Sequence, residues 1–490
     1  MPSTTRRQPR SSRVRQHHRP DPRPKVQPRS RTAGRPTGSR SRPGWVARNM
    51  DARRERKLGR RERWSFEALR RDTLSLLTEA EVEQLARESG FYQRSPRAIW
   101  ALDFALCTAL SSMVEAKRGF ASVWRLLSAA AQVDVARSAV TQRFGYASAC
   151  LMEQLFALAL QRLPQDSCPE TVGRLAEFRA VLANDGSVLM LSPLLRKLFP
   201  ATRTNSMGAA GKLHLTADLV QRRVVQVRLT GERFSELEAA RALPLEPGTL
   251  YINDLGYTSY DYFADIKNAD AQLLMRLKDN ANPTVVHVRH GVRAPVAAVR
   301  EGLRLNDLES RLTQCHDTFD LDAQFKIKGG TVVLRVVGVY NSETGKYHRY
   351  VTTLSPDQWT PQELAALYSR RWEIELLFKL LKSSCHMDHL DTSDPHAVRT
   401  LVYASLLAAI ILTSLCHAAA QVHGIPAEAI SPLMAGIAAP LMVLPLLLLW
   451  FDKKLTPEQL ADSLLRVLAL GCRNQNPNRT RDKWRTLAAA

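Results

Sequence analysis

The chain has 490 residues, 45% hydrophobic and 24% charged, so most of it can bury apolar cores and fold. Its net charge of +22 indicates a polyanionic partner, with nucleic acid favoured over an anionic membrane surface. The seven scattered cysteines form no Cys-x-x-Cys pair, which excludes the usual zinc-finger spacing and favours free thiols. The N-terminus lacks the apolar core of a signal peptide, so we expect a cytoplasmic protein.

Residues 1–63 carry most of this charge, with 21 Lys and Arg against 4 Asp and Glu. They are rich in Arg, Pro and Ser, which is typical of a disordered tail. Such a tail either tethers DNA non-specifically, by displacing counter-ions from phosphates, or is merely solvated. Met50 offers an alternative start, so the sequence leaves open whether the tail is native.

Residues 64–175 are predicted to form a helical, DNA-binding domain, because apolar residues recur at spacings of three and four. Two short predicted helices, 121–130 and 137–144, flank a turn-like segment, as in a helix-turn-helix. Many helical hairpins share this pattern. The residues that the second helix would present to DNA are Arg137, Ser138, Thr141, Gln142 and Arg143.

From Phe178 the pattern changes to strands mixed with short helices, which predicts an α/β core. We expect the first part of this core at 176–278 and its second part at 355–421. The β-rich residues 279–354 between them are predicted to be an insertion.

Residues 422–490 are predicted to be a C-terminal helical region, with an amphipathic helix near 457–470. Within it, residues 433–451 contain no charge and meet the length criterion for a membrane span. Pro440 and Pro445 would each remove a helix hydrogen bond. We therefore favour a broken, buried helical hairpin over a membrane span or an apolar dimer surface.

Two aspartates occupy settings suited to a metal ligand. Asp185 precedes Gly186-Ser187, and Asp254 precedes Leu255-Gly256, each at the expected end of a strand. A carboxylate there is held by a rigid sheet yet open to solvent. The alternative is ordinary turn chemistry, because Asp-Gly is a common turn.

A third carboxylate lies in a long predicted helix at 363–384. At about 100° per residue, one face of that helix gathers a phenol, a guanidinium, a carboxylate and ammonium groups. The residues of this face are Tyr368, Arg371, Trp372, Glu375, Lys379 and Lys382. Glu373 lies off the face. The alternative is a solvated face with ion pairs such as Arg371 with Glu375.

The spacing Tyr-x2-Arg-x3-Glu-x6-Lys resembles the signature of DDE insertion-sequence transposases of the insertion-sequence-four group. The resemblance covers about residues 64–420 and implies a ribonuclease H-like core interrupted by a β-rich insertion. It implies that Asp185, Asp254 and Glu375 are the three acidic positions. It also implies hairpin formation on the transposon end and a homodimer on paired DNA ends.

Three converging carboxylates repel one another unless cations lie between them, and Mg²⁺ or Mn²⁺ suits such oxygen ligands. Two ions would serve both cleavage and strand transfer of double-stranded DNA. Tyr368, Arg371 and Lys382 would hold phosphates near the scissile bond.

Other basic residues are weaker candidates for DNA contacts, since outward-facing strand charges are equally expected: Lys212, His214, Arg276 and Lys278. Tyr340, Tyr347 and Tyr350 either stack an unpaired base or are simply sheet residues. We expect His386 and His389 to pack rather than to bind metal.

The sequence predicts a bacterial, nucleoid-associated transposase that does not enter the membrane. Three other classes stay open: an inactive or domesticated DNA-binding relic, a nuclease without strand transfer, and a membrane-associated protein. The sequence does not reveal the terminal repeats or the target site.

Overall fold

The computed structural model describes residues 75–450, except 97, 115–118, 132, 134, 164–173, 203–207, 222, 290–300, 313–317, 389 and 427–428. The predicted tail at 1–63, the amphipathic segment near 457–470 and His389 lie outside the described residues.

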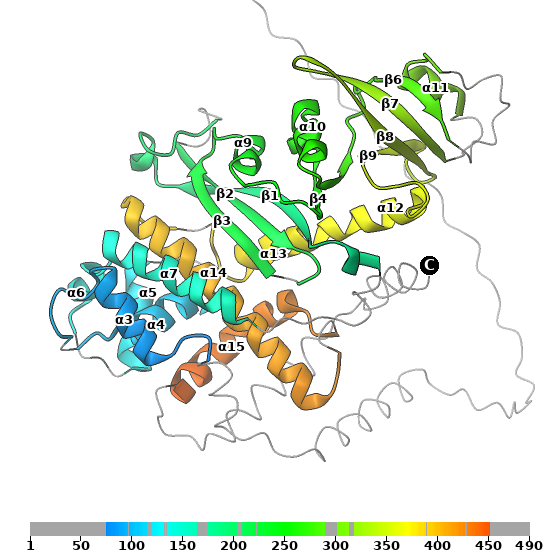
Figure 1. Ribbon diagram of the computed structural model, residues 1–490. Coiled ribbons are helices and arrows are strands. Elements are labelled where there is room, and N and C mark those ends of the chain that lie inside the picture. The colour runs from blue at the N-terminus through cyan, green and yellow to red at the C-terminus, as the bar shows by residue number, and fades with distance from the viewer. Residues whose placement is uncertain are drawn as a thin grey trace, which may run out of the picture. The chain divides into compact units, whose positions relative to one another are not determined.

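The N-terminal part of the described chain is helical, as its apolar spacing predicts (Figure 1). Its helices are α3 (Glu79–Glu88), α4 (Ala101–Val114), α5 (Phe120–Ala129), α6 (Arg137–Thr141) and α7 (Tyr146–Arg162). Helices α5 and α6 correspond to the expected helix-turn-helix pair, but α6 ends at Thr141 rather than Phe144. That a DNA-binding domain spans 64–175 stays a prediction.

The described strands form one mixed sheet in the order β3-β2-β1-β4-β5-β9-β8-β7-β6. The first five are β1 (Ala180–Leu191), β2 (Ala209–Asp218), β3 (Arg223–Gly231), β4 (Thr249–Asn253) and β5 (Gln272–Arg276). The others are β6 (Thr284–Val288), β7 (Phe319–Ile327), β8 (Gly330–Asn341) and β9 (Lys346–Thr352). Strand β4 runs parallel to β1 and β5, and the remaining pairs are antiparallel. The expected α/β class is thus confirmed.

The β-rich stretch shares the sheet of the core. Strand β9 pairs with β5, with Met275 opposite Val351, so β6 to β9 extend the first five strands. Helix α11 (Leu305–Leu312) lies within this stretch. Whether the stretch counts as an inserted domain stays a prediction.

Apolar side chains cover both faces of the sheet centre. Leu250 and Ile252 join one core cluster with the helices α4, α7, α14 and α15, while Tyr251 joins a second cluster with α10. Because successive strand residues point to opposite faces, this alternation shows that helices cover both sides of β4. The helices α9 (Glu236–Arg241), α10 (Tyr260–Asn268), α12 (Pro361–Tyr368) and α13 (Trp372–Ser383) complete these layers.

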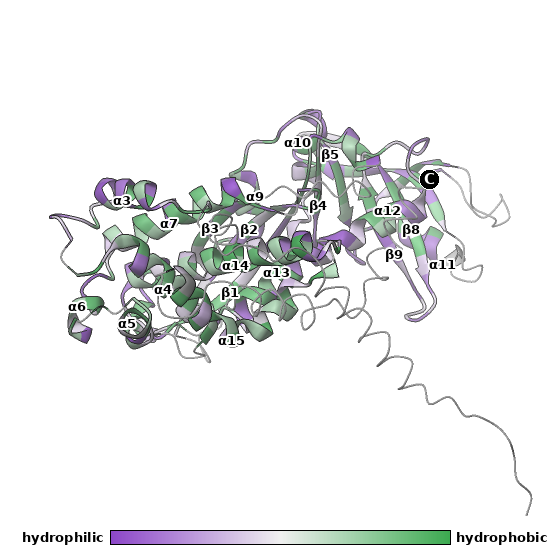
Figure 2. Cartoon of the chain, turned by 90° about the horizontal axis from the view of Figure 1, so that it is seen from below, coloured by the Kyte–Doolittle hydropathy of each residue, from purple (hydrophilic) through white to green (hydrophobic). Residues whose placement is uncertain are grey.

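Helix α14 (Pro395–His423) is the one described helix that is long and apolar enough to cross a membrane, but 89% of its apolar window is buried inside the fold. It packs on α4, α7, α13 and α15. Figure 2 shows α14 and the helices around it coloured largely as hydrophobic. Helix α14 is therefore a core helix of the folded chain.

The expectation of a broken helical hairpin at 433–451 is wrong. Helix α15 (Pro432–Trp450) runs through both Pro440 and Pro445. Burial of one side against α4, α13 and α14 holds the helix despite the two lost hydrogen bonds. Its other side exposes Ile437, Leu441 and Leu444.

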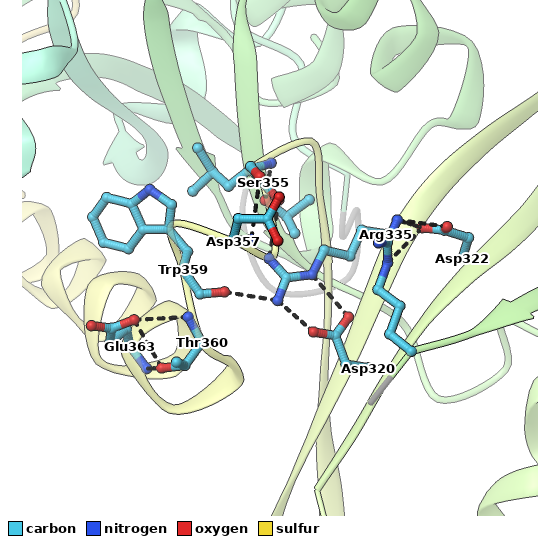
Figure 3. A network of polar contacts seen from close by, with 11 residues as sticks. Asp320, Asp322, Arg335, Ser355, Asp357, Trp359, Thr360 and Glu363 are labelled. Atoms are coloured by element: carbon cyan, nitrogen blue, oxygen red, sulfur yellow. Dashed lines mark hydrogen bonds and ion pairs between the residues drawn. The ribbon is translucent and has the colours of Figure 1, made fainter. Parts of the chain in front are cut away.

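A buried ion pair ties β8 to the segment that leads into α12 (Figure 3). Arg335 donates from Nε to Asp320 Oδ1 at 2.9 Å and from Nη2 to Oδ2 at 2.5 Å. The same guanidinium donates to the carbonyls of Leu354 and Trp359 at 3.0 and 2.8 Å. Both charged side chains are less than 10% exposed, at 4% and 9%. Arg335 therefore holds the segment before α12 against β8.

We expect Arg335→Met to lower the free energy of unfolding by about 3–5 kcal/mol, because it leaves the Asp320 carboxylate buried without its partner. Arg289→Met is the matched control: Arg289 pairs with Asp322 in the same region, at 2.6 Å, but its side chain is 30% exposed. That change should lower the free energy of unfolding by at most about 1 kcal/mol. Urea unfolding measures both, and equal losses would contradict the role assigned to Arg335.

Candidate active site

Strand register places Asp185 and Asp254 side by side. The parallel pairing of β1 with β4 runs to Asn184 opposite Asn253, and each aspartate is the next residue. Neighbouring strands lie about 4.8 Å apart, so the two aspartates leave the pairing as neighbours.

The two aspartates differ in their backbone setting. Strand β4 ends at Asn253, so Asp254 follows a strand as expected. The expectation that β1 ends at Asp185 is wrong, because β1 continues to Leu191. Beyond Asn184 it keeps β2 as its partner, with Asp185 opposite Leu215, and this antiparallel ladder holds it extended.

A buried polar clasp fixes this register. Asn253 Oδ1 accepts hydrogen bonds from Asn184 N–H at 3.1 Å and from its Nδ2 at 3.0 Å. The Oδ1 of Asn184 accepts one from the Thr216 hydroxyl of β2 at 2.6 Å. Both asparagines are buried, so a slipped register would leave polar groups without partners. The sequence signal for this clasp is the Asn-Asp dipeptide that occurs at the end of both paired segments.

The predicted single helix at 363–384 is interrupted, so the expectation of a continuous helix is wrong. Helix α12 ends at Tyr368, a 3-10 turn spans Ser369–Arg371, and α13 begins at Trp372. The Ser369 hydroxyl donates to the carbonyl of Ala366 at 2.7 Å, a back-bond that bends helices. A 3-10 segment inside a helix often marks a functional position.

The interruption still leaves the polar side chains together at the sheet. Tyr368 Oη donates to Asp254 Oδ1 at 3.3 Å. Arg371 Nη1 lies 3.8 Å from Asp185 Oδ2, and Nη2 bonds Glu375 Oε1. The same guanidinium lies 5.8 Å from the centre of the Tyr368 ring. The structure thus links all three predicted acidic residues through one phenol and one guanidinium.

The electrostatics of this cluster are dominated by burial. Burial raises the pKa of Asp185 to about 6; the Gly186 N–H and Arg371 oppose the rise, while Glu236 and Glu375 add to it. Burial also raises the pKa of Tyr368 well above its ordinary value, and Asp254 raises it further. Tyr368 therefore stays protonated and acts as a hydrogen-bond donor.

The donor set suits a hard cation, since Asp185, Asp254 and Glu375 all offer carboxylate oxygens. Within the described ranges, no three or more His, Cys, Asp or Glu residues are grouped closely enough to hold a metal ion. The guanidinium of Arg371 lies between Asp185 and Glu375 instead and supplies the positive charge there.

The two lysines predicted on the same helix face as Glu375 are not among the residues that link the helix to the aspartates. Lys379 is exposed and Lys382 is half-buried. Arg276 ends β5 opposite Tyr350, whose ring lies 5.1 Å from that of Tyr368. Arg276 is therefore beside the cluster, whereas Lys278 is exposed two residues beyond it.

Several predicted DNA contacts already have structural partners. Lys212 Nζ lies 3.5 Å from Glu236 Oε1. His214 is buried and bonds Thr230 at 2.9 Å. Arg143 donates to the carbonyl of Phe91 at 3.1 Å. These contacts favour the structural interpretation of all three.

Of the other four helix-turn-helix residues of the prediction, Thr141 is half-buried and three are exposed: Arg137, Ser138 and Gln142. In the β-rich stretch, Tyr347 and Tyr350 are buried and Tyr340 packs against Tyr347. The packing favours the interpretation of these tyrosines as sheet residues. His386 Nδ1 donates to the Ser112 carbonyl at 2.8 Å, as expected of a packing histidine.

Glu236 was not predicted from the sequence. It is the first residue of α9, and its carboxylate lies against both Gly186 and Gly256, which follow Asp185 and Asp254. A single acidic residue in an ordinary amphipathic helix gives no signal of such a position.

Comparison with known proteins agrees with this geometry. A family model described as "Transposase DDE domain" matches residues 197–411, a range that holds Asp254 and Glu375 and begins after Asp185. The transposase of insertion sequence element IS231F from Bacillus thuringiensis subsp. israelensis is 23% identical over 369 residues, 68% of this chain and 76% of that protein. The family match and this relative support an insertion-sequence transposase of the DDE family.

A second relative of this transposase is that of IS231E from Bacillus thuringiensis subsp. finitimus, 22% identical over 69% of this chain and 77% of that protein. Among solved structures, a piggyBac transposase synaptic complex with hairpin DNA matches 83% of this chain and 86% of its own, at 11% identity and a TM-score of 0.42.

The raised pKa of Asp185 predicts how the stability of the transposase depends on pH. A carboxyl with a higher pKa in the folded than in the unfolded chain costs stability as pH rises from its unfolded value near 3.8 through about 6. In EDTA at pH 7.5 we therefore expect the free energy of unfolding of Asp185→Asn to be about 2 kcal/mol higher than that of wild type. The difference should shrink towards zero near pH 4.

Urea unfolding across this pH range measures the effect. Glu343→Gln, which removes an exposed carboxylate from the β8–β9 turn, controls for the loss of one negative charge. A constant difference between Asp185→Asn and wild type from pH 4 to 7.5 would show that the Asp185 carboxyl is not responsible.

Proposed function

We propose that this transposase cuts and joins double-stranded DNA at a site formed by Asp185, Asp254 and Glu375. The observation that carries the proposal is the pair of links from the signature helix to the sheet. Tyr368 bonds Asp254, and Arg371 contacts both Asp185 and Glu375. Chain segments almost 200 residues apart thus meet at one point, with the side chains that the chemistry needs.

Two Mg²⁺ or Mn²⁺ ions are the cofactors that these three carboxylates would hold. Such ions activate a water on one side of a phosphodiester and stabilise the leaving 3′ oxygen on the other. The raised pKa of Asp185 supports this assignment, because a buried carboxylate with incomplete compensation favours a nearby cation.

Arg371 is the residue that must exchange partners for the reaction. In the structure its guanidinium neutralises Asp185 and Glu375. A planar guanidinium binds phosphate through two parallel hydrogen bonds, so DNA offers it an equivalent anionic partner. Arg371 is the last residue of the 3-10 turn between α12 and α13.

Tyr368 acts beside Arg371 as a neutral donor. Its hydroxyl donates to Oδ1 of Asp254 and orients that carboxylate. Arg276, which lies close to the Tyr368 ring system, and Lys382 would bind phosphates on either side of the scissile bond. The further DNA contacts that we propose are Lys379, Lys212, Arg137, Gln142 and Arg143, although Lys212 and Arg143 would first have to leave their present partners.

We further infer strand transfer by the same site, a ribonuclease H-like core, and a homodimer on paired transposon ends. The core is supported by the order β3-β2-β1-β4-β5, with three antiparallel strands followed by two parallel ones. We place the protein in the bacterial cytoplasm, associated with the nucleoid, because it acts on DNA.

The experiment that tests the proposal is cleavage of the element's own end DNA in Mg²⁺ by wild type and by Glu375→Gln. We expect the variant to lose at least about 100-fold in rate, since even residues behind a metal ligand contribute 10–100-fold. EDTA should abolish cleavage by wild type, and added Mg²⁺ should restore it.

Glu373→Gln is the matched control, because Glu373 lies in the same helical turn but pairs with Arg370 at 2.6 Å. It should retain cleavage. If Glu375→Gln cleaves as fast as Glu373→Gln, the proposed site is wrong. If cleavage proceeds but no joined product forms, the protein is a nuclease without strand transfer.

A further inference from the structure

Glu236 reaches both aspartate-bearing segments at once. A Cβ built on Gly186 would lie 3.0 Å from Glu236 Oε1, and a Cβ on Gly256 would overlap Oε2. Neither glycine has a positive φ, so backbone conformation does not require glycine at either position. The missing side chains instead leave room for the carboxylate of Glu236.

The local fold holds Glu236 in this place. Ser235 caps α9 by accepting a hydrogen bond from Glu238 N–H at 3.0 Å, and Glu238 accepts one from Ser235 N–H at 3.2 Å. Helix α9 packs against β1 and against the turn at Leu255–Tyr257 that follows Asp254. The carboxylate is thus held against Gly186 and Gly256 by a defined element of structure.

The charge around this position is unbalanced. Arg371 contacts the carboxylates of Asp185 and Glu375, and Lys212 contacts that of Glu236, so two cations face three carboxylates in this region. Lys212 Nζ is 3.5 Å from Glu236 Oε1, and both side chains are largely buried, with 15% and 27% exposed. Such an excess of negative charge in a partly desolvated place favours a further cation.

Glu236 also faces an open cavity of about 570 Å³. Lys212 and Gly256 line it, together with Arg233 and Phe234. A water molecule or the backbone of a DNA strand can therefore approach Glu236 and Lys212 from outside without any rearrangement of the sheet.

We propose that Glu236 is a fourth acidic residue of the cleavage site, a positioning residue that supports the divalent cation at Asp185 and Asp254 through water and thereby frees Lys212 for a DNA phosphate. The inference rests on the proposed function. In the cation-free state Lys212 neutralises Glu236. Once a divalent cation takes over that charge, the ammonium is released towards the cavity, where the strand passes.

The test is Mn²⁺ binding in the absence of DNA, followed by electron paramagnetic resonance, for wild type and Glu236→Gln. The variant keeps the shape of the side chain and removes its charge. We expect about tenfold weaker Mn²⁺ binding, as is usual for groups that support a metal through another ligand. The Mg²⁺ concentration for half-maximal cleavage should rise by a similar factor, while the rate at saturating Mg²⁺ changes little.

Glu232→Gln is the matched control. Glu232 lines the same cavity, but its carboxylate accepts the Thr202 N–H at 2.8 Å rather than facing the two glycines. It should bind Mn²⁺ as wild type does. If Glu236→Gln also binds Mn²⁺ with unchanged affinity, Glu236 is only an internal partner of Lys212 and the inference is wrong.

A second pair of variants tests the contact itself. Gly256→Ala should displace the Glu236 carboxylate and weaken Mn²⁺ binding about as much as Glu236→Gln does. In a Glu236→Ala background the same glycine change should weaken Mn²⁺ binding no further, because the effects of substitutions at residues in contact are not additive. Independent, additive losses would overturn the inference, since the glycine would then act on the fold alone.

Failure of this inference is distinguishable from failure of the proposed function. If Asp254→Asn abolishes cleavage and Glu236→Gln leaves Mn²⁺ binding unchanged, the three-carboxylate site stands without Glu236. If Asp254→Asn cleaves normally, the site itself is wrong.

Discussion

The proposed active site depends on the hydrogen bonds between Asn184 and Asn253. They fix the register of two parallel strands at the point where those strands part, and the next residue of each strand is a proposed acidic ligand. A slip of one residue would turn every side chain of β4 to the other face of the sheet. Thr216 extends the clasp to β2, so three strands share one buried polar network. Such a network is strongly specifying because each unmade bond would cost free energy.

The third acidic residue is placed by a different device. Arg335 holds the segment before the signature helix to the strands β7 and β8. The polar face of this helix closes on the sheet through Tyr368 and Arg371. The buried Arg335–Asp320 pair thus helps to position the signature helix, whereas the side-chain amides of Asn184 and Asn253 set the register of β1 and β4. The helix contacts the residue after each of these asparagines, Asp185 and Asp254.

The sequence predicted much of this arrangement, because local patterns of residues specify the strands and the polar face of the signature helix. Period-two strands, the two aspartates beside them and the spacing of Tyr368, Arg371 and Glu375 are all visible in the chain. The rest depended on contacts between distant residues. The continuation of β1 past Asp185 requires the ladder with β2, and the break at Ser369 requires one side-chain bond that competes with the helix. The approach of Glu236 to two glycines exists only after three segments have packed.

The position of β9 beside β5 has a consequence for how the molecule is made. About 70 residues separate these paired strands, and α13 follows only after β9 has joined the sheet. Closing so long a loop costs entropy before any contact repays it, so this pairing forms late in folding. On the ribosome, Asp185 and Asp254 emerge before Glu375 is synthesised. The core helices α14 and α15 that pack in one cluster with β4 follow Glu375 in the chain, so a nascent chain gathers the three proposed acidic residues only after most of it has been made.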